Sequence, residues 1–363
     1  MGAVALPKAA RPLNNDVLLI AAPAVIPRDE KWMAKLESLH PGLKVRWVGQ
    51  SGGYPPEPLP EELSKEVTLL CPLWDYPAEQ LPNVRFVQLL SAGANLWVKN
   101  DLYKNRDIIF CTTNGAHAPQ IAEWVIGTWL MHSHHFLDYA AQQKKAQIAR
   151  LNNLGVYDSP GLRMGVLGYG AIGRHCAKLG QALGMEVYAY TRSEKPTPES
   201  RKDDSYCVPG TGDPDGIIPT KWFHGSSREA VNNFLAQDLD FLVLSLPLTE
   251  ATKHILSREQ FDILSKKKTF VSNIARGEHI DTGALLEALQ QGKIRGAALD
   301  VTDPEPLPDG HPLFTMPNVF ITPHVSWETP YLLPRLQEIV ERNLHSLSKG
   351  EPLINVMNRE YHY

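Results

Sequence analysis

The chain contains 363 residues, of which 43% are hydrophobic and 21% are charged, and its formal net charge is −4. This length allows two domains with separate cores, and the composition is that of an ordinary globular protein. The nearly balanced charge, with a pI near 6.4, argues against nucleic acid or an anionic membrane as the main partner.

The cysteines are four in number and widely spaced, and no two of them form a CxxC pair: Cys71, Cys111, Cys176 and Cys207. This pattern favours reduced thiols over disulfides and argues against a zinc site. Residues 1–15 lack the charged and then apolar build of a signal peptide, and no apolar run reaches a membrane-spanning length. We therefore expect a cytoplasmic protein that binds no metal.

The first third of the chain alternates between short apolar runs and helical segments, which is typical of a small α/β unit. Strands are predicted at 17–20, 45–48, 67–70, 84–87 and 108–111, and a helix is predicted at 31–39. A long helix is predicted from Pro119 onward, because Ile121, Val125 and Trp129 recur at helical spacing.

A second α/β series is predicted from Leu162 to about His324. Ser257 with Gln260 resembles a capping box, and Asp281 and Gly292 are suited to begin and end another helix. Leucine, isoleucine and valine then recur at helical spacing over 332–347, so we expect a final amphipathic helix that returns to the first domain.

A glycine-rich turn opens this second series. The sequence GYGAIG at 168–173 lies between a predicted strand at 162–167 and a predicted helix at 171–183, and a second strand is predicted at 185–190. In this context the glycines permit a tight turn, close approach of a pyrophosphate and helix packing, while the helix N-terminus attracts the phosphates. The predicted pyrophosphate-binding residues are Gly168, Tyr169, Gly170, Ala171, Ile172 and Gly173.

These patterns predict an α/β fold class with two Rossmann-like domains. A doubly wound parallel-sheet, dinucleotide-binding domain at 119–330 is expected to be inserted in a smaller, flavodoxin-like substrate-binding domain built from 1–118 and 331–363.

The end of the second strand of the dinucleotide-binding series indicates which cofactor is used. Binding of a ribose 2′-hydroxyl needs a carboxylate there, whereas the chain has Thr191, Arg192 and Ser193. Arg192 can pair with a 2′-phosphate, and the two hydroxyls can donate to it. NADP(H) is therefore preferred and NAD(H) is possible, since Arg192 could also be a solvated surface charge or stack on adenine.

The stretch 194–216 is rich in Pro, Gly, Asp, Lys and Ser, and it is too long for an ordinary connection between a strand and a helix. We interpret it as a solvated insertion. The alternatives are a flap over the cofactor and a contact with a second subunit.

Reactive side chains follow three predicted strands in the last third of the chain. Arg276 follows 269–273, Glu305 follows 297–301, and His324 follows 319–322. If these strands are neighbours in a parallel sheet, the three side chains converge at its carboxyl edge, where open α/β sheets bind ligands.

These three side chain types suit an anionic substrate and the transfer of one proton. A guanidinium binds a carboxylate in a bidentate manner, and a carboxylate beside an imidazole holds it in one tautomer. The structural alternatives are a buried ion pair for Arg276, an exposed loop acid for Glu305 and a core histidine for His324.

Together these segments resemble the D-isomer-specific 2-hydroxyacid dehydrogenases. The resemblance rests on NIARG at 273–277, on LDV at 299–301 followed by Glu305-Pro306-Leu307, and on TPH at 322–324. SAG at 91–93, LPLT at 246–249 and the glycine turn are also similar to that family, and CPLW at 71–74 weakly resembles its glyoxylate/hydroxypyruvate reductase branch.

The resemblance implies roles for individual residues. Arg276 would bind the 2-oxo acid, His324 would exchange the proton, and Glu305 would orient His324. The backbone N–H groups of Ala92 and Gly93 would receive the substrate carboxylate. The residues implied along the nicotinamide and its loop are Leu246, Pro247, Thr252, Ile274 and Asp300. Family members are commonly dimers through the cofactor domain, so a homodimer is expected.

Two tryptophans depart from the family pattern. Trp74 and Trp327 could shape an apolar part of the substrate site, or they could pack between the domains. His132 and His135 would share one face of a helix, but no third metal ligand is evident, so we predict no metal site there.

The predicted function is NADP(H)-dependent reduction of a small 2-oxo acid to the D-2-hydroxy acid, with His324 as proton donor. The alternatives are a nucleotide-sensing, corepressor-like binding protein with the same fold, and an NAD-dependent dehydrogenase of the formate or phosphite type.

Overall fold

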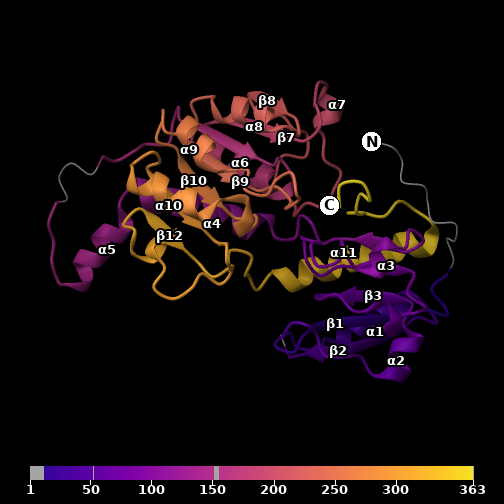
Figure 1. Cartoon of the computed structure of the whole chain (residues 1–363). Helices are drawn as coiled ribbons and strands as arrows, with labels where there is room; N and C mark the ends of the chain where they lie inside the picture. The colour runs from indigo at the N-terminus through magenta and orange to yellow at the C-terminus, as the bar shows by residue number, and fades with distance from the viewer. Residues whose placement is uncertain (1–11, 52, 151–154, 363) are drawn as a thin grey trace. The chain divides into compact units, whose positions relative to one another are not determined.

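The computed structural model describes residues 12–51, 53–150 and 155–362. The chain divides into two compact units, and in Figure 1 the first of them contains both the indigo N-terminal part and the yellow C-terminal part of the chain. Unit 1 contains residues 1–116 and 330–363, and unit 2 contains residues 117–329. Residues 1–11 and Tyr363 lie outside the described residues. The prediction that no signal peptide is present concerned residues 1–15, so most of its range is among them.

Unit 1 contains a five-stranded sheet in which every neighbouring pair of strands is parallel. Its strands are β1 (Val17–Pro23), β2 (Lys44–Gln50), β3 (Leu69–Pro72), β4 (Phe86–Gln88) and β5 (Ile109–Cys111). The order β2-β1-β3-β4-β5 is the flavodoxin-like order that the sequence predicts.

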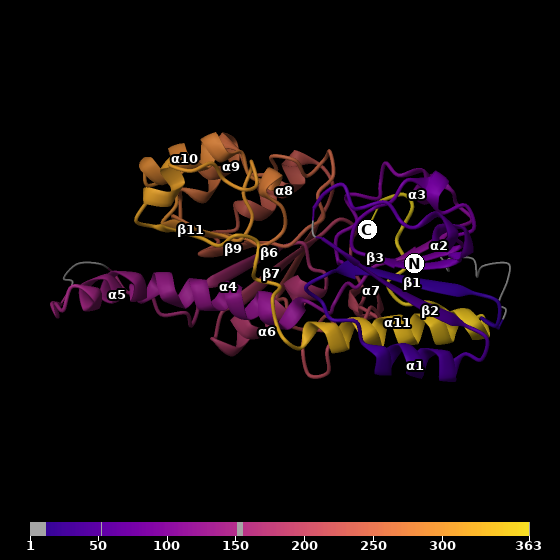
Figure 2. The same cartoon turned by 90° about the horizontal axis from the view of Figure 1, so that it is seen from below.

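Helices cover both faces of this sheet. They are α1 (Glu30–Leu39), α2 (Glu61–Glu66), α3 (Asp101–Lys104) and α11 (Leu332–Lys349), with a short 3-10 helix η1 (Ala78–Gln80). Figure 2 shows α11 beside α1, and the indole of Trp32 on α1 donates to Glu341 on α11 over 3.0 Å. The last helix therefore belongs to the first unit.

Unit 2 contains a seven-stranded parallel sheet in the order β12-β11-β10-β9-β6-β7-β8. Its strands are β6 (Arg163–Leu167), β7 (Glu186–Thr191), β8 (Lys221–His224), β9 (Phe241–Leu244), β10 (Phe270–Asn273), β11 (Gly296–Leu299) and β12 (Val319–Ile321). The strand order reverses between β6 and β9, as in doubly wound dinucleotide-binding folds.

Both faces of this second sheet are also covered. Unit 2 contains the helices α4 (Ala118–Ser133), α5 (Phe136–Lys144), α6 (Ala171–Ala182), α7 (Pro198–Arg201), α8 (Arg228–Leu235), α9 (Arg258–Leu264) and α10 (Thr282–Gln290), with 3-10 helices η2 (Gly277–His279) and η3 (Pro312–Thr315), and α4, α6, α8, α9 and α10 cover the sheet. Phe241 and Val243 of β9 pack on the side of α4 and α6, while Leu242 and Leu244 pack on the side of α8, α9 and α10. Burial on both faces explains the continuous apolar strands.

The predicted helix starts at Ser257 and Asp281 are confirmed. The backbone N–H of Ser257 donates to Gln260 Oε1 over 3.1 Å, and Asp281 Oδ1 accepts from the backbone N–H of Ala284 over 3.0 Å. Within the described ranges, the structure contains no helix that combines the length and the apolar character needed to cross a bilayer.

One prediction about the long helix is wrong. Helix α4 ends at Ser133, and His135 has a left-handed backbone with φ of 56°, so His132 and His135 do not share one helical face. His132 instead stacks on Phe270, with 4.5 Å between ring centroids. Burial, with a smaller contribution from the charge of Arg295, lowers the pKa of His132 to about 4.

Candidate active site

The strands that precede Arg276, Glu305 and His324 are neighbours. β11 pairs in parallel with β10 on one side and with β12 on the other, so the adjacency that the sequence suggested is confirmed. All three side chains follow the carboxyl ends of their strands, at one edge of the sheet in unit 2.

Glu305 and His324 form a direct pair. His324 Nδ1 lies 2.7 Å from Glu305 Oε1, and both side chains are about two-fifths exposed, at 41% and 40%. A carboxylate can only accept, so the pair places a proton on Nδ1 and leaves Nε2 for chemistry.

The main chain of His324 is fixed on both sides. Its N–H donates to the carbonyl of Asp300 over 2.8 Å, and its own carbonyl accepts from the indole N–H of Trp327 over 2.7 Å. The residue has a φ of 56°, a left-handed conformation that non-glycine residues seldom adopt without such support.

Asp300 organises the segment that carries His324. One carboxylate oxygen accepts from Thr322 Oγ1 over 2.6 Å and from the Val325 N–H over 2.9 Å. The other oxygen accepts from the N–H and the hydroxyl of Ser326, at 3.1 and 2.5 Å. The sequence suggested Asp300 only as a residue beside the cofactor and missed this role, because the donors lie more than twenty positions away.

Arg276 is half-buried at the start of η2, and its Nη1 donates to the carbonyl of Ala275 over 2.6 Å. Burial lowers the pKa of Arg276, and the negative charge of Glu305 opposes that shift. A Cβ at Gly277 would lie 1.9 Å from the carbonyl oxygen of Thr302, so only glycine lets this backbone approach the loop that leads to Glu305.

The glycine turn has the geometry that a dinucleotide requires. It connects β6 to α6, and a Cβ added at Gly170 would meet nothing within 4 Å. A Cβ at Gly173 would lie 2.3 Å from the carbonyl oxygen of Gly168, so the helix packs against the turn only with glycine there. The open side at Gly170 and the start of α6 at Ala171 fit a bound pyrophosphate.

The three residues at the end of β7, Thr191, Arg192 and Ser193, include no carboxylate. Thr191 is the last residue of the strand, and its hydroxyl donates to the carbonyl of Ser193 over 2.8 Å. Arg192 and Ser193 are exposed.

The family model for the NAD binding domain of D-isomer specific 2-hydroxyacid dehydrogenases matches residues 126–209 and 221–326, more than half of the chain. The chain belongs to the D-isomer-specific 2-hydroxyacid dehydrogenase family. This family consists of oxidoreductases that use a nicotinamide cofactor.

Individual relatives agree with this assignment. The chain is 32% identical to a D-3-phosphoglycerate dehydrogenase of Methanocaldococcus jannaschii over 70% of its own length, but it spans only 44% of that relative. It is 29% identical to a hydroxypyruvate reductase of Blautia hydrogenotrophica, with 77% of this chain and 80% of the relative covered.

A solved structure also matches over nearly the whole chain. It is a D-isomer specific 2-hydroxyacid dehydrogenase from Xanthobacter autotrophicus Py2 in complex with NADPH and MES, with a TM-score of 0.72 and 27% identity. The match covers 96% of this chain and 99% of that one.

We interpreted the stretch 194–216 of this chain as a solvated insertion, and that interpretation is wrong because the stretch is partly buried. Asp213 is only 4% exposed and accepts from the hydroxyl of Tyr169, in the glycine turn, over 2.7 Å. Arg174 on α6 donates to the carbonyls of Asp213 and Arg201 and pairs with Asp203 over 3.2 Å. The insertion therefore packs on the glycine turn at 168–173 and on α6, through polar partners that composition alone does not reveal.

The loop after β9 contains several residues of the predicted nicotinamide side. Leu246 is half-buried, Pro247 is exposed, and Thr252 Oγ1 donates to the carbonyl of Pro247 over 2.9 Å. Ile274, which follows β10, is only 7% exposed.

The predicted substrate residues of unit 1 follow two of its strands. Trp74 is half-buried after β3. Ala92 and Gly93 are half-buried after β4, and the hydroxyl of Ser91 donates to the Gly93 carbonyl over 2.7 Å. Trp327, in unit 2, is 39% exposed.

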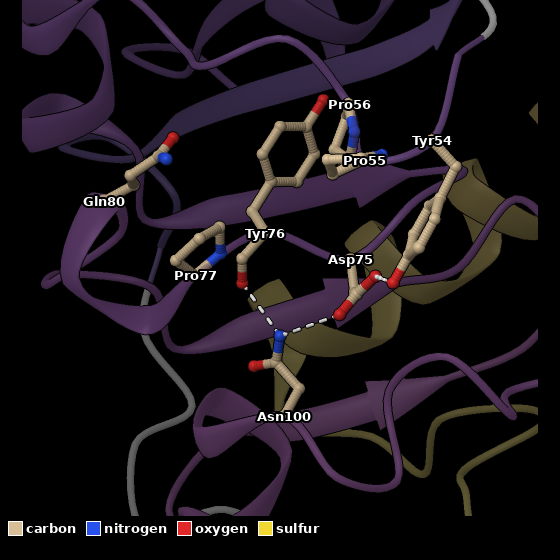
Figure 3. Close-up of a pocket in the computed structure, with 8 residues that line it drawn as sticks. All are labelled: Tyr54, Pro55, Pro56, Asp75, Tyr76, Pro77, Gln80 and Asn100. Atoms are coloured by element: carbon tan, nitrogen blue, oxygen red, sulfur yellow. Dashed lines mark hydrogen bonds between the residues drawn. The ribbon is translucent and has the colours of Figure 1, made fainter.

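Unit 1 also has a pocket that the sequence did not suggest (Figure 3), with a volume of about 400 Å³. Its lining is aromatic, proline-rich and polar: Tyr54, Pro55, Pro56, Asp75, Tyr76, Pro77, Gln80 and Asn100. Asp75 accepts from the Tyr54 hydroxyl over 3.2 Å and from the Asn100 amide over 3.3 Å. Burial raises the pKa of Tyr76 to about 12. No predicted site residue lines this pocket.

Proposed function

We propose that the chain catalyses the NADP(H)-dependent reduction of a small 2-oxo acid to the D-2-hydroxy acid. The observation that carries this proposal is the 2.7 Å pair between His324 and Glu305, at the sheet edge that Arg276 shares. A proton donor, a carboxylate that orients it and a cation for an anionic substrate are the groups that this reaction needs.

His324 moves the proton in this proposal. A bound nicotinamide cofactor supplies the hydride for carbon C2 of the substrate. Nε2 of the imidazolium donates its proton to the carbonyl oxygen during reduction and accepts one from the hydroxyl during oxidation. Glu305, which accepts the Nδ1–H, orients the ring and stabilises the positive charge before transfer.

Arg276 binds and polarises the substrate. Its fork of donors suits the carboxylate and the adjacent carbonyl oxygen of a 2-oxo acid. The half-buried position supports this role, since partial desolvation strengthens an ion pair with the substrate. As part of the same proposal, Ala92 and Gly93 donate to the substrate carboxylate, and Trp74 and Trp327 contact its side chain.

Cofactor preference is part of the proposal. The exposed Arg192 between Thr191 and Ser193, with no carboxylate among them, supports NADP(H) over NAD(H). The similar Xanthobacter autotrophicus enzyme binds NADPH, which is consistent with this choice. Leu246, Pro247, Thr252, Ile274 and Asp300 complete the proposed nicotinamide side.

We also propose a homodimer that forms through unit 2. Helix α5 contains no buried residue and exposes Phe136, Leu137 and Tyr139. Figures 1 and 2 both show α5 at the far end of α4, away from the sheet of its own unit. These exposed apolar side chains are suited to contact a second copy. The four free thiols fit the reducing cytoplasm, which we propose as the compartment.

The test is a panel of 2-oxo acids, from glyoxylate through hydroxypyruvate to phenylpyruvate, assayed with NADPH and with NADH. We expect turnover that is faster with NADPH, and chiral analysis of the product should give the D isomer. If both cofactors bind but no 2-oxo acid is turned over, the proposal is wrong and a nucleotide-sensing role is favoured.

A further inference from the structure

The imidazole of His279 contacts the main chain of two segments of the proposed site, at Arg276 and at Pro247. It ends the 3-10 helix η2 and has an exposed fraction of 0%. Its Nδ1 lies 3.2 Å from the backbone N of Arg276 and 3.0 Å from the Arg276 carbonyl oxygen. Its Nε2 lies 3.3 Å from the carbonyl oxygen of Pro247, in the loop after β9.

The hydrogen bonds around His279 select one tautomer. The Arg276 carbonyl already accepts from Asn273 Nδ2 over 2.9 Å and from the backbone N–H of His279 over 3.3 Å. Both of its lone pairs are therefore used, so Nδ1 is placed to accept from the Arg276 N–H. Nε2 then carries the proton and donates to Pro247, so both ring nitrogens are satisfied.

The charge state of His279 agrees with this assignment. Burial lowers the pKa of His279, the nearby positive charge of Arg276 lowers it further, and the carbonyls of Pro247 and Arg276 oppose the shift. Near neutral pH the ring is thus neutral, with one donor and one acceptor.

We propose that the imidazole of His279 is a positioning residue for the reaction: it links the main chain of Arg276 to that of Pro247. The Pro247 carbonyl also accepts from Thr252 Oγ1, so the loop after β9 is held at this point from two sides. The guanidinium that binds substrate and the loop on the nicotinamide side thereby keep a fixed separation. This inference rests on the proposed function for its catalytic consequence, but the hydrogen-bonded link can be tested without it.

The first test removes the link and follows both binding and turnover. His279→Leu replaces the imidazole by an apolar side chain of similar size, while His279→Asn keeps an acceptor near Nδ1 and loses the donor to Pro247. We expect His279→Leu to lower kcat and to weaken binding of oxalate to the NADPH-loaded protein, each by roughly tenfold or more. NADPH affinity should change by less than about threefold, because the turn at 168–173 is untouched. His279→Asn should recover part of the loss.

A matched variant separates positioning from a general loss of stability. Leu285→Ala, on the buried face of α10, should lower the melting temperature of the protein without changing kcat or oxalate binding. If Leu285→Ala reduces kcat as much as His279→Leu at an equal loss of melting temperature, the positioning role is refuted. Wild-type kcat and oxalate affinity in His279→Leu would refute it as well.

The second test reads the tautomer directly. Nitrogen-15 NMR of the wild-type protein, with His279 assigned by comparison with His279→Asn, should show a neutral ring that is protonated on Nε2. Protonation on Nδ1, or a charged ring at neutral pH, overturns the link. This measurement needs no turnover, so it distinguishes failure of this inference from failure of the proposed function.

Discussion

At the scale of single residues, His324 is held by three hydrogen bonds of different kinds. Its N–H, its carbonyl and its Nδ1 bond to Asp300, Trp327 and Glu305, respectively. The ring therefore has little freedom to turn away from a substrate, which is the condition for efficient proton transfer. Of the three partners, only Glu305 contributes a charge to the bond.

Changing Glu305→Gln should lower kcat by roughly 100-fold, because the amide can still accept from Nδ1 but no longer stabilises the imidazolium. NADPH affinity should stay unchanged, since the glycine turn is separate in the chain. Steady-state kinetics and cofactor titration measure both quantities. Glu229→Gln, an exposed change on α8, serves as the control, and an unchanged kcat in Glu305→Gln would remove Glu305 from the mechanism.

Changing Arg192→Asp should raise KM for NADPH by roughly 10-fold to 100-fold, since a charge-assisted hydrogen bond to phosphate is lost and a repulsive charge is added. KM for NADH should change little, so NADH kinetics on the same variant provide the internal control. Equal losses with the two cofactors would contradict the role in 2′-phosphate binding.

At the scale of elements, part of the insertion after β7 is buried against the rest of unit 2. Asp213 accepts from the Tyr169 hydroxyl and from the backbone N–H groups of Ile217 and Ile218, over 2.7, 3.0 and 3.2 Å. One buried carboxylate thus ties the insertion to the glycine turn at 168–173. Polar residues carry these contacts, which is why composition suggested a solvated loop.

Changing Asp213→Ala should loosen the insertion and the turn together, because each buried donor left without a partner costs about 1–3 kcal/mol. Trypsin should cut faster at Arg201 and Lys202, and NADPH binding should weaken. Limited proteolysis and cofactor titration measure these effects. Asp215→Ala changes an exposed carboxylate in the same insertion and should resemble the wild type.

Most strands could be predicted from sequence because they are short runs rich in apolar residues, as in Gly296–Leu299, which is fully buried. Two strands were not identified: β8 (Lys221–His224), a half-exposed edge strand, and β9 (Phe241–Leu244), a short, fully buried apolar run. Arg276, Glu305 and His324 could be selected from motifs that follow strands. His279 could not, because its partners are main-chain atoms that any sequence would supply.

At the scale of the whole molecule, acid stability should depend on buried histidines. Burial lowers the pKa of both His132 and His175 to about 4, from an ordinary value of 6.5. As the pH falls, the unfolded chain binds these protons before the folded protein does. The contribution of the two histidines to the free energy of unfolding is therefore fully present above pH 6.5 and is lost as the pH falls toward 4. Each histidine contributes on the order of 3 kcal/mol to this loss, at about 1.4 kcal/mol per pKa unit.

Changing His175→Asn should therefore reduce the drop in melting temperature between pH 7 and pH 5, since the amide can still accept from the Gly212 N–H but does not titrate. Differential scanning calorimetry at the two pH values measures the drop. His224→Asn, at an exposed position, should leave the drop as in the wild type. An identical drop in all three proteins would exclude His175 as a contributor.

Association through α5 can be tested by placing a charge on its exposed apolar surface. Leu137→Asp should shift the mass measured by light scattering from about twice the chain mass of 40.5 kDa toward that of a single chain. Leu39→Asp, at an exposed leucine in unit 1, should not change the mass. A wild-type protein of single-chain mass would contradict the proposed dimer.

The donors that surround Asp300 imply uneven mutational tolerance along the segment that follows β12. Val325 contributes only its backbone N–H, so any side chain that fits the space could replace it. Ser326 contributes its hydroxyl as well, so a saturation library at that position should retain serine and threonine and lose the other residues. The adjacent positions 325 and 326 should therefore accept substitutions at different rates during evolution.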